Sequence, residues 1–203
     1  MVVHPTYRNW SGTLLNGLLW HLRDTSTAVE PRIVTRLDKD TSGLVLVALT
    51  SDIHTQLQRD FSRHLVTKQY LAIVQGTPDP ARGSIALPLA RSAADRRRVV
   101  VDPSGQESRT NYEVLCTEGG RSLIRCELVT GRTHQIRVHL AARGWPLLGD
   151  LTYGVAHESI SRQALHAWRL SMPHPATREA LEIEAAIPPD LQRVVAIDQN
   201  RTL

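Results

Sequence analysis

The sequence contains few of the patterns that mark secreted, membrane-spanning or cofactor-binding proteins. Only two of its 203 residues are cysteines, Cys116 and Cys126, and they lack the spacing of a CxxC motif. We therefore expect free, buried thiols, as is usual in a cytosolic protein. No apolar run approaches the roughly 20 residues of a membrane-spanning helix, and nothing at the start resembles a signal peptide. These absences favour a cytoplasmic protein.

Motifs for common cofactors and nucleophiles are also absent. The chain has no GxxxxGK[ST] or GxGxxG loop for phosphates, no GxSxG elbow of a serine hydrolase and no HExxH zinc pattern. Nine histidines are present, but no cluster of His and Cys has the spacing of metal ligands. The sequence therefore predicts neither a metal nor an organic cofactor.

Composition and charge set the broad class. An apolar fraction of 41% in 203 residues is enough to build one globular core. Lys and Arg outnumber Asp and Glu by 24 to 20, which gives a formal net charge of +4. This basic excess is compatible with a polyanionic partner such as RNA, although many ordinary protein surfaces are equally basic.

Hydrophobic periodicity predicts a mixture of helices and strands. Apolar residues recurring every three or four positions, with hydroxyl residues placed as caps, predict helices over residues 14–22, 51–64 and 133–143, and Pro188 opens a short terminal helix. Alternating or β-branched runs predict strands over residues 33–34, 44–49, 66–75, 85–89, 99–101, 110–116, 122–129, 165–172 and 181–185. Because the elements show no βαβα rhythm and several strands connect through short turns, we expect an α+β fold with a largely antiparallel or mixed sheet.

A polar turn between two apolar runs is the first candidate site. Residues 31–50 read PRIVTRLDKDTSGLVLVALT, and the turn at 36–43 holds two carboxylates, two cations and two hydroxyls. Asn-Gly or Asp-Gly would close a hairpin more simply, so this turn carries more chemistry than a connection needs. Asp38 is therefore a candidate to face a substrate, but an Asp in a turn also commonly caps its own backbone. For Asp40 we favour the capping interpretation.

Residues 131–140, GRTHQIRVHL, form the second candidate site. A glycine turn followed by a helix capped by Thr133 presents backbone N–H groups at an anion-friendly terminus, with Arg132 beside it. Arg137 lies one turn into a mostly apolar helix, where it is either a solvated edge or the partner of a carboxylate. Tyr70, on the predicted strand 66–75, is by default a core or interface aromatic.

Motifs in these segments resemble those of the RluA family of pseudouridine synthases. RLDKDTSG resembles the family's HRLDxxTSG, which contains the catalytic aspartate, and KQYLA resembles its K-x-Y-x-A motif. TGRTHQIRVH, PLLGD with a following YG, and LHA with PHP resemble three further segments in the same order. The similarity extends over residues 2–189, which is nearly the whole chain.

The resemblance implies an RNA pseudouridine synthase with the fold of that family. Such a fold is α+β, with a mixed, largely antiparallel central sheet flanked by helices and loops around a central active-site cleft. We expect one catalytic domain over residues 1–203, acting without a cofactor as a cytoplasmic monomer on ribosomal or transfer RNA. The family detaches uracil from C1′ of the ribose, rotates it and rejoins it through C5.

Catalytic roles are carried over by position. Asp38 would be the catalytic carboxylate, which attacks the sugar, attacks the base or removes the 2′ proton. Arg137 would pair with Asp38 and keep it charged inside a pocket that excludes water. Tyr70 would stack on a uracil flipped out of the RNA, and its hydroxyl would assist removal of the C5 proton. Contacts to the substrate or RNA would come from Arg36, Leu37, Ile136, Arg132 and His134.

Two departures from the family pattern leave a second function open. Thr35 stands where the family usually has His, and the strand and Lys-Pro-x-Gly turn at the start of relatives have no counterpart, so we expect one sheet edge to be short. No separate RNA-binding domain precedes the motifs, so recognition is expected from the catalytic domain itself. Together with the basic loop at Arg96, Arg97 and Arg98, these departures leave a catalytically weak RNA-binding or chaperone-like module as the alternative.

Overall fold

The computed structural model describes residues 1–5, 9–25 and 29–194. Val195, predicted to lie on the inner face of the last helix, is outside these ranges. The helices are α1 (Leu14–His21), α2 (Ser51–Ser62), α3 (Gln135–Ala142) and α4 (Pro189–Gln192). The strands are β1 (Arg32–Ile33), β2 (Ser42–Gly43), β3 (Val47–Ala48), β4 (Thr67–Gln75), β5 (Arg82–Ala86), β6 (Leu89–Arg91), β7 (Val99–Val101), β8 (Arg109–Glu118), β9 (Arg121–Leu128), β10 (Leu165–Pro173) and β11 (Ala180–Glu184).

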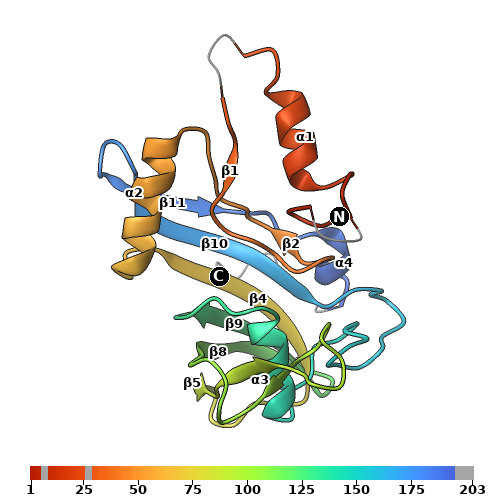
Figure 1. Cartoon of the computed structure of the whole chain (residues 1–203). Coiled ribbons are helices and arrows are strands. Elements are labelled where there is room, and N and C mark those ends of the chain that lie inside the picture. Colours follow the sequence, from red (N-terminus) through yellow and green to blue (C-terminus); the bar gives the residue numbers. More distant parts are fainter. Residues whose placement is uncertain (6–8, 26–28, 195–203) are drawn as a thin grey trace.

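A seven-stranded sheet forms the centre of the molecule (Figure 1). Its order is β11-β10-β4-β9-β8-β5, with every neighbouring pair antiparallel, and β2 adds a parallel pairing to β10. The short pairs β1–β3 and β6–β7 lie outside this sheet. The prediction of an α+β fold with a mixed, largely antiparallel sheet is therefore confirmed.

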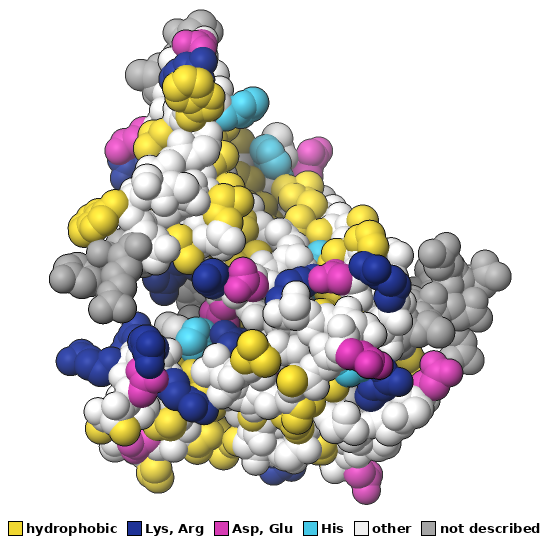
Figure 2. Space-filling view, turned by 90° about the vertical axis from the view of Figure 1, so that its right-hand side faces the viewer, with side chains coloured by type: hydrophobic (Ala, Val, Ile, Leu, Met, Phe, Trp, Pro, Cys, Tyr) yellow, Lys and Arg dark blue, Asp and Glu magenta, His cyan; other side chains and the backbone are white. Residues whose placement is uncertain are grey.

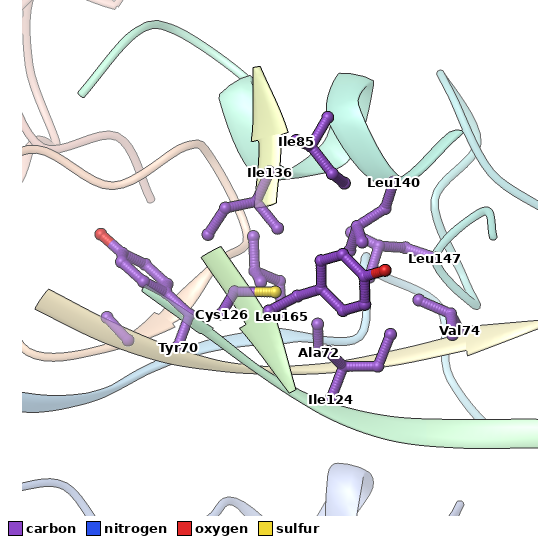
Figure 3. Packing of buried hydrophobic residues seen from close by; sticks show 12 residues of the cluster. Tyr70, Ala72, Val74, Ile85, Ile124, Cys126, Ile136, Leu140, Leu147 and Leu165 are labelled. Atoms are coloured by element: carbon purple, nitrogen blue, oxygen red, sulfur yellow. The ribbon is translucent and has the colours of Figure 1, made fainter. Parts of the chain in front are cut away.

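Strand β4 runs through the core and is buried on both faces. Tyr70, Ala72 and Val74 belong to a cluster that includes residues of α3, whereas Leu71 and Ile73 belong to a second cluster that includes Leu191 of α4. This division follows from the alternation of side chains across a strand. Figure 3 shows the first cluster, in which α3 packs over β4 and β9 and so brings its own residues above the middle of the sheet.

Helix α2 begins as the sequence predicts. The side chain of Thr50 caps it by accepting a hydrogen bond from the N–H of Ile53. Its inner face carries Leu57, which packs in a third apolar cluster with Leu170 of β10. None of the helices in the described part of the chain is long and apolar enough to cross a membrane.

Several sequence predictions need correction. Helix α3 begins at Gln135, two residues later than expected, and Thr133 is exposed and does not cap it. His134 precedes the helix in the left-handed region, with φ of 54°, because the chain turns sharply there into the core. The expected strand at 85–89 lies at 82–86. The sequence also predicts a polar loop over residues 90–98, but residues 90 and 91 belong to β6. The C-terminus of α3 does agree with the prediction, because Gly144, with φ of 79°, lies just past the helix.

The cysteines were predicted to be free and buried. Both are free, and burial raises the pKa of the Cys126 thiol to about 12. Cys116 is only partly buried, because it lies near the end of β8, where the sheet meets solvent. The expectation of burial is therefore right for one of the two thiols.

Candidate active site

The turn that carries Asp38 is fastened to the segment before β10. The backbone N–H of Thr41 donates to the carbonyl of Asp38 at 3.1 Å, which closes the turn. From the other segment, Nε2 of Gln163 donates to the carbonyl of Lys39 at 2.6 Å and to Oγ1 of Thr41 at 2.9 Å. Asp38 therefore lies on a turn held from two sides, which is a rigid place for a reactive group.

Strand β2 joins the same turn to the central sheet. Ser42 and Gly43 pair in parallel with His166 and Ala167 of β10, and Oγ of Ser42 is 2.9 Å from Nδ1 of His166. A Cβ atom at Gly43 would lie 2.1 Å from the carbonyl oxygen of Ala167, and its φ is 110°. Only glycine permits this close approach, so the final residue of the TSG motif fixes the distance between the turn and β10.

Thr35, which departs from the family pattern, has a structural role in this protein. Its Oγ1 accepts a hydrogen bond of 2.8 Å from the N–H of Leu46. The N–H groups of Val34 and Thr35 in turn donate to the carbonyl of Leu46. The threonine hydroxyl thus closes the β1–β3 hairpin below the turn that carries Asp38.

Arg137 of α3 lies between two carboxylates. Its Nη1 donates to Oδ2 of Asp38 at 3.2 Å, while Nε and Nη2 donate to Oδ2 and Oδ1 of Asp150 at 2.7 and 2.9 Å. The exposed fraction of the side chain is 8% for Arg137, 21% for Asp38 and 0% for Asp150. The prediction that Arg137 pairs with a carboxylate therefore agrees with the geometry, and the stronger of its two pairs is with Asp150.

Electrostatics keep the Arg137–Asp150 pair charged. Burial opposes the charge of each group, but their mutual hydrogen bonds and attraction outweigh it, so that the pKa of Arg137 is raised and the pKa of Asp150 is lowered. The backbone N–H groups of Thr152 and Tyr153 also donate to Oδ1 of Asp150, at 2.9 and 3.1 Å. These bonds favour the ionised carboxylate.

Tyr70 stands at the border between the apolar core and the charged pair. Figure 3 shows its ring at the edge of the cluster, with the hydroxyl pointing away from the packed aliphatic side chains. Burial raises the pKa of Tyr70, and the nearby negative charge of Asp38 raises it further. Ile136 belongs to the same cluster and Leu37 packs against it. The structure thus brings Asp38, Arg137, Tyr70, Ile136 and Leu37 together.

His134 extends the site toward the β6–β7 loop. Its Nδ1 lies 2.7 Å from the hydroxyl of Tyr153, and that hydroxyl accepts the N–H of Val99 at 2.7 Å. Burial lowers the pKa of His134 against the opposing pull of Asp38, so the ring is neutral at pH 7. Since Tyr153 already accepts the bond from Val99, we assign its O–H as the donor to Nδ1, which leaves the His134 proton on Nε2.

The two remaining predicted residues lie on the surface. Arg36 is exposed, and Arg132 is exposed with its Nε donating to the carbonyl of Glu107 at 3.3 Å. Across the described ranges, neither side chain forms a hydrogen bond or ion pair with Asp38 or Arg137. Figure 2 shows Lys and Arg side chains on both sides of a hollow in which acidic and histidine side chains are visible. Arg36 and Arg132 remain predicted RNA contacts.

Sequence reasoning assigned no role to Asp150 or Tyr153, although it quoted the PLLGD segment that contains Asp150. The signal for Asp150 in the sequence is indirect: a buried arginine on an apolar helix needs a carboxylate, and the family motifs assign that place to Asp38 alone. Tyr153 lies in the YG that follows PLLGD, but its role could not be read from the motif, since its partners His134 and Val99 are 19 and 54 residues away in sequence. No group of three or more His, Cys, Asp or Glu side chains among the described residues could hold a metal ion.

Known proteins resemble this chain in both sequence and fold. A family model described as RNA pseudouridylate synthase matches residues 1–142. The chain belongs to this family. The ribosomal large subunit pseudouridine synthase D of Zymomonas mobilis is 41% identical to it over 207 residues, which cover 95% of this chain and 65% of the relative. A Chloroflexus aurantiacus protein named as an uncharacterized RNA pseudouridine synthase is 43% identical over 205 residues, covering 99% and 65%.

A solved relative supports the same conclusion about the fold. The human RNA pseudouridylate synthase domain containing 1 has a TM-score of 0.74 and 29% identity, covering 94% of this chain and 85% of that one. The family resemblance read from the motifs is therefore confirmed, as is the pseudouridine synthase fold. The chain spans slightly less than two thirds of the curated pseudouridylate synthases named above, 65% in each case.

Proposed function

We propose that this protein is an RNA pseudouridine synthase that isomerises uridines in ribosomal or transfer RNA, with Asp38 as its catalytic carboxylate. The observation that carries the proposal is the contact between Asp38 and Arg137. These residues are 99 positions apart in sequence, and they meet beside the buried Tyr70 at the three positions that the motifs single out. The names of the curated relatives favour ribosomal RNA as the substrate.

The reaction suits a carboxylate with one oxygen left open. The N1–C1′ bond of uridine breaks and a C5–C1′ bond forms, while the C5 proton leaves and N1 gains a proton, so no external reagent is consumed. In the described part of the chain, only Oδ2 of Asp38 has a hydrogen-bond partner. Oδ1 can therefore attack the sugar, attack the base or remove the 2′ proton, three roles that share the same requirement for an ionised carboxylate.

Tyr70 is suited to hold the flipped base. Its ring is fixed by the core cluster, and its raised pKa keeps the hydroxyl protonated at neutral pH. A protonated phenol donates a hydrogen bond and stacks on uracil, but it removes a proton poorly. Of the two roles that the family resemblance implies for Tyr70, stacking is therefore the better supported.

RNA contacts are proposed for the basic loop of residues 92–98. Arg98 fastens this loop to the site, because Nη2 donates to the carbonyl of Thr152 at 2.7 Å and the guanidinium lies 5.4 Å from the Tyr153 ring. Arg96 and Arg97 are exposed on the same loop. Replacing both with Ala should raise the KM for RNA and reduce its salt dependence, since fewer phosphate contacts would release fewer counterions. An unchanged KM at moderate salt would remove the loop from the interface.

The direct test is tritium release from RNA labelled at C5 of uracil. Wild type should release tritium, and Asp38→Asn should release none above background, because the amide is a poor nucleophile and a poor base. RNA binding by this variant should remain at the wild-type level. Full activity of Asp38→Asn would contradict the role of Asp38.

The alternative is an RNA-binding or chaperone-like module on the same fold. It predicts salt-sensitive binding by wild type with no pseudouridine in the treated RNA, as judged by mass spectrometry after chemical labelling. Mapping pseudouridines across total RNA with and without the gene would identify the modified nucleotide. The proposal includes a monomer in the cytoplasm, which sedimentation and cell fractionation would test.

A further inference from the structure

The guanidinium of Arg137 donates hydrogen bonds to two carboxylates, but it binds one of them more strongly than the other. Arg137 gives Nε and Nη2 to Asp150 in a bidentate pair at 2.7 and 2.9 Å, and gives Asp38 only Nη1 at 3.2 Å. A bidentate arginine–carboxylate pair fixes both the distance and the plane of the guanidinium. The orientation of Arg137 is therefore set by Asp150.

Asp150 itself cannot follow a movement of Arg137. Two backbone N–H groups, of Thr152 and Tyr153, hold its Oδ1 at 2.9 and 3.1 Å. Gly149 just before it leaves no space, since a Cβ there would lie 2.1 Å from the carbonyl oxygen of Arg162. The carboxylate is thus anchored to the backbone on one side and to Arg137 on the other.

This arrangement limits how Asp38 can be engaged. If Arg137 were free to turn, its Nε–Nη2 side would form a bidentate pair with Asp38 and occupy both carboxylate oxygens. With that side taken by Asp150, Asp38 receives a single hydrogen bond at Oδ2. We propose that Asp150 is a positioning residue for the isomerisation, which turns Arg137 so that one oxygen of Asp38 stays open to the nucleoside. This inference rests on the proposed function.

The fold offers a matched control for Asp150. Asp60 of α2 has the same exposed fraction of 0% and is paired with Arg178 at 2.7 and 2.9 Å. In both pairs a hydrogen bond to the arginine lowers the pKa of the aspartate, at Asp60 as the largest cause and at Asp150 against the larger effect of burial. No contact joins Asp60 or Arg178 to Asp38 among the described residues. Replacing Asp60 therefore removes a bidentate pair of an equally buried aspartate without touching the site, with an arginine that is 43% exposed where Arg137 is 8% exposed.

The test is a double-mutant cycle on the full chain. Asp150→Asn should lower kcat about 100-fold with little change in KM, as expected when a catalytic group is misplaced by about 1 Å. Added to Arg137→Lys, which already lacks the bidentate fork, Asp150→Asn should cause little further loss, because both changes remove the same interaction. Asp60→Asn should leave kcat unchanged alone and in combination with Arg137→Lys.

Multiplicative losses for Asp150→Asn and Arg137→Lys would overturn the inference, since they would mean that Asp150 does not act through Arg137. A second readout does not depend on activity. The Nε–H of Arg137 should exchange slowly with solvent in wild type and in Asp60→Asn, and quickly in Asp150→Asn, as measured by nitrogen-15 NMR. Unchanged protection in Asp150→Asn would also overturn it.

Asp150→Glu covers the case in which Asp150→Asn does not fold. It keeps the charge but moves the carboxylate by one methylene, so kcat should fall by about tenfold through displacement of Arg137. Full activity of Asp150→Glu would contradict a positioning role. If wild type forms no pseudouridine, the proposed function fails, and the positioning role in the isomerisation fails with it. An active wild type with multiplicative losses in kcat refutes the positioning role alone.

Discussion

Helices α1 and α3 are both eight residues long, but they are stabilised in opposite ways. Helix α1 has a capping box formed by Thr13 and Asn16, and none of its residues is buried. Helix α3 has no side-chain cap at its first residue, starts from a left-handed His134, and buries six consecutive residues. Figure 1 shows that α1 extends away from the central sheet, whereas α3 lies against the sheet.

The difference shows where local and tertiary interactions each decide structure. The capping box of α1 lies within four residues, so its sequence carries its own start signal, and the N–H groups of Leu14 and Leu15 also donate to the carbonyls of Val2 and Val3. Helix α3 replaces a cap with the side chain of Gln135, which accepts from Thr130 and from the N–H of Arg132 and donates to Arg109 and Thr110. The helix that carries Arg137 is therefore positioned by contacts with β8.

Gln135→Ala should have the largest effect, because it removes four hydrogen bonds at the start of α3, one of them to the buried Thr110. We expect the free energy of unfolding to fall by about 3 kcal/mol, since each intramolecular hydrogen bond contributes roughly 0.5–1.5 kcal/mol. Urea denaturation with a constant m-value would measure it. A loss below about 1 kcal/mol would show that α3 does not depend on these bonds to β8.

The pH dependence of stability tests the burial of α3 through His139. Burial lowers the pKa of His139, against an opposing hydrogen bond to the carbonyl of Leu87, so the folded protein holds it neutral. As pH falls below 6.5, the value of an exposed histidine, the unfolded chain binds a proton that the folded protein does not. Stability should therefore decrease with falling pH, by up to about 1.4 kcal/mol per pH unit for this group.

The measurement is urea denaturation of wild type and His139→Gln between pH 8 and pH 5. The variant should be less stable at pH 8, because bonds to Thr110 and Leu87 are lost, but its stability should change less with pH. Since burial also lowers the pKa of His134 and His166, part of the slope should remain. An identical slope in both proteins would mean that His139 titrates alike in the folded and unfolded states.

Thr13→Ala should have a smaller effect, confined to α1. Loss of the cap is expected to cost about 1 kcal/mol, and it should speed amide hydrogen exchange in residues 14–17 about fivefold without changing exchange in α3. Thr133→Ala is the matched control, since Thr133 is exposed and caps nothing. Its effect should stay within about 0.5 kcal/mol. A larger loss of stability in Thr133→Ala would indicate that Thr133 does cap α3, as the sequence predicts.

Elements whose signals are local were predictable from sequence. The amphipathic repeat and the Thr50 cap gave α2 within two residues of its observed end, and β4 was predicted within one residue. The start of α3 was not predictable, because the β8 groups that hold the side chain of Gln135 are 25 and 26 residues away in sequence. The pairing of β2 with β10 also gave no local signal, since two residues are too few for a strand pattern.

The site was predictable only in part, for a similar reason. An aspartate in a turn fits both capping and catalysis, so the residues alone left Asp38 undecided, and the family motifs supplied its partner. Thr35 stood out only as a departure from the family motif, and its structural role becomes clear only from the hydrogen bond to Leu46 in the folded chain. Asp150 was missed because its backbone anchors and its arginine become neighbours only after folding.

The parallel contact of β2 with β10 has a consequence for biosynthesis. Ser42 and His166 are separated by 124 residues, and Gln163 reaches back the same distance to Lys39. A growing chain that has already made β4, β8, β9 and α3 still lacks the strand that holds the turn of Asp38. Closing so long a loop is among the later events of folding. Asp38 is therefore fixed opposite Arg137 only after the ribosome has translated past Ala167.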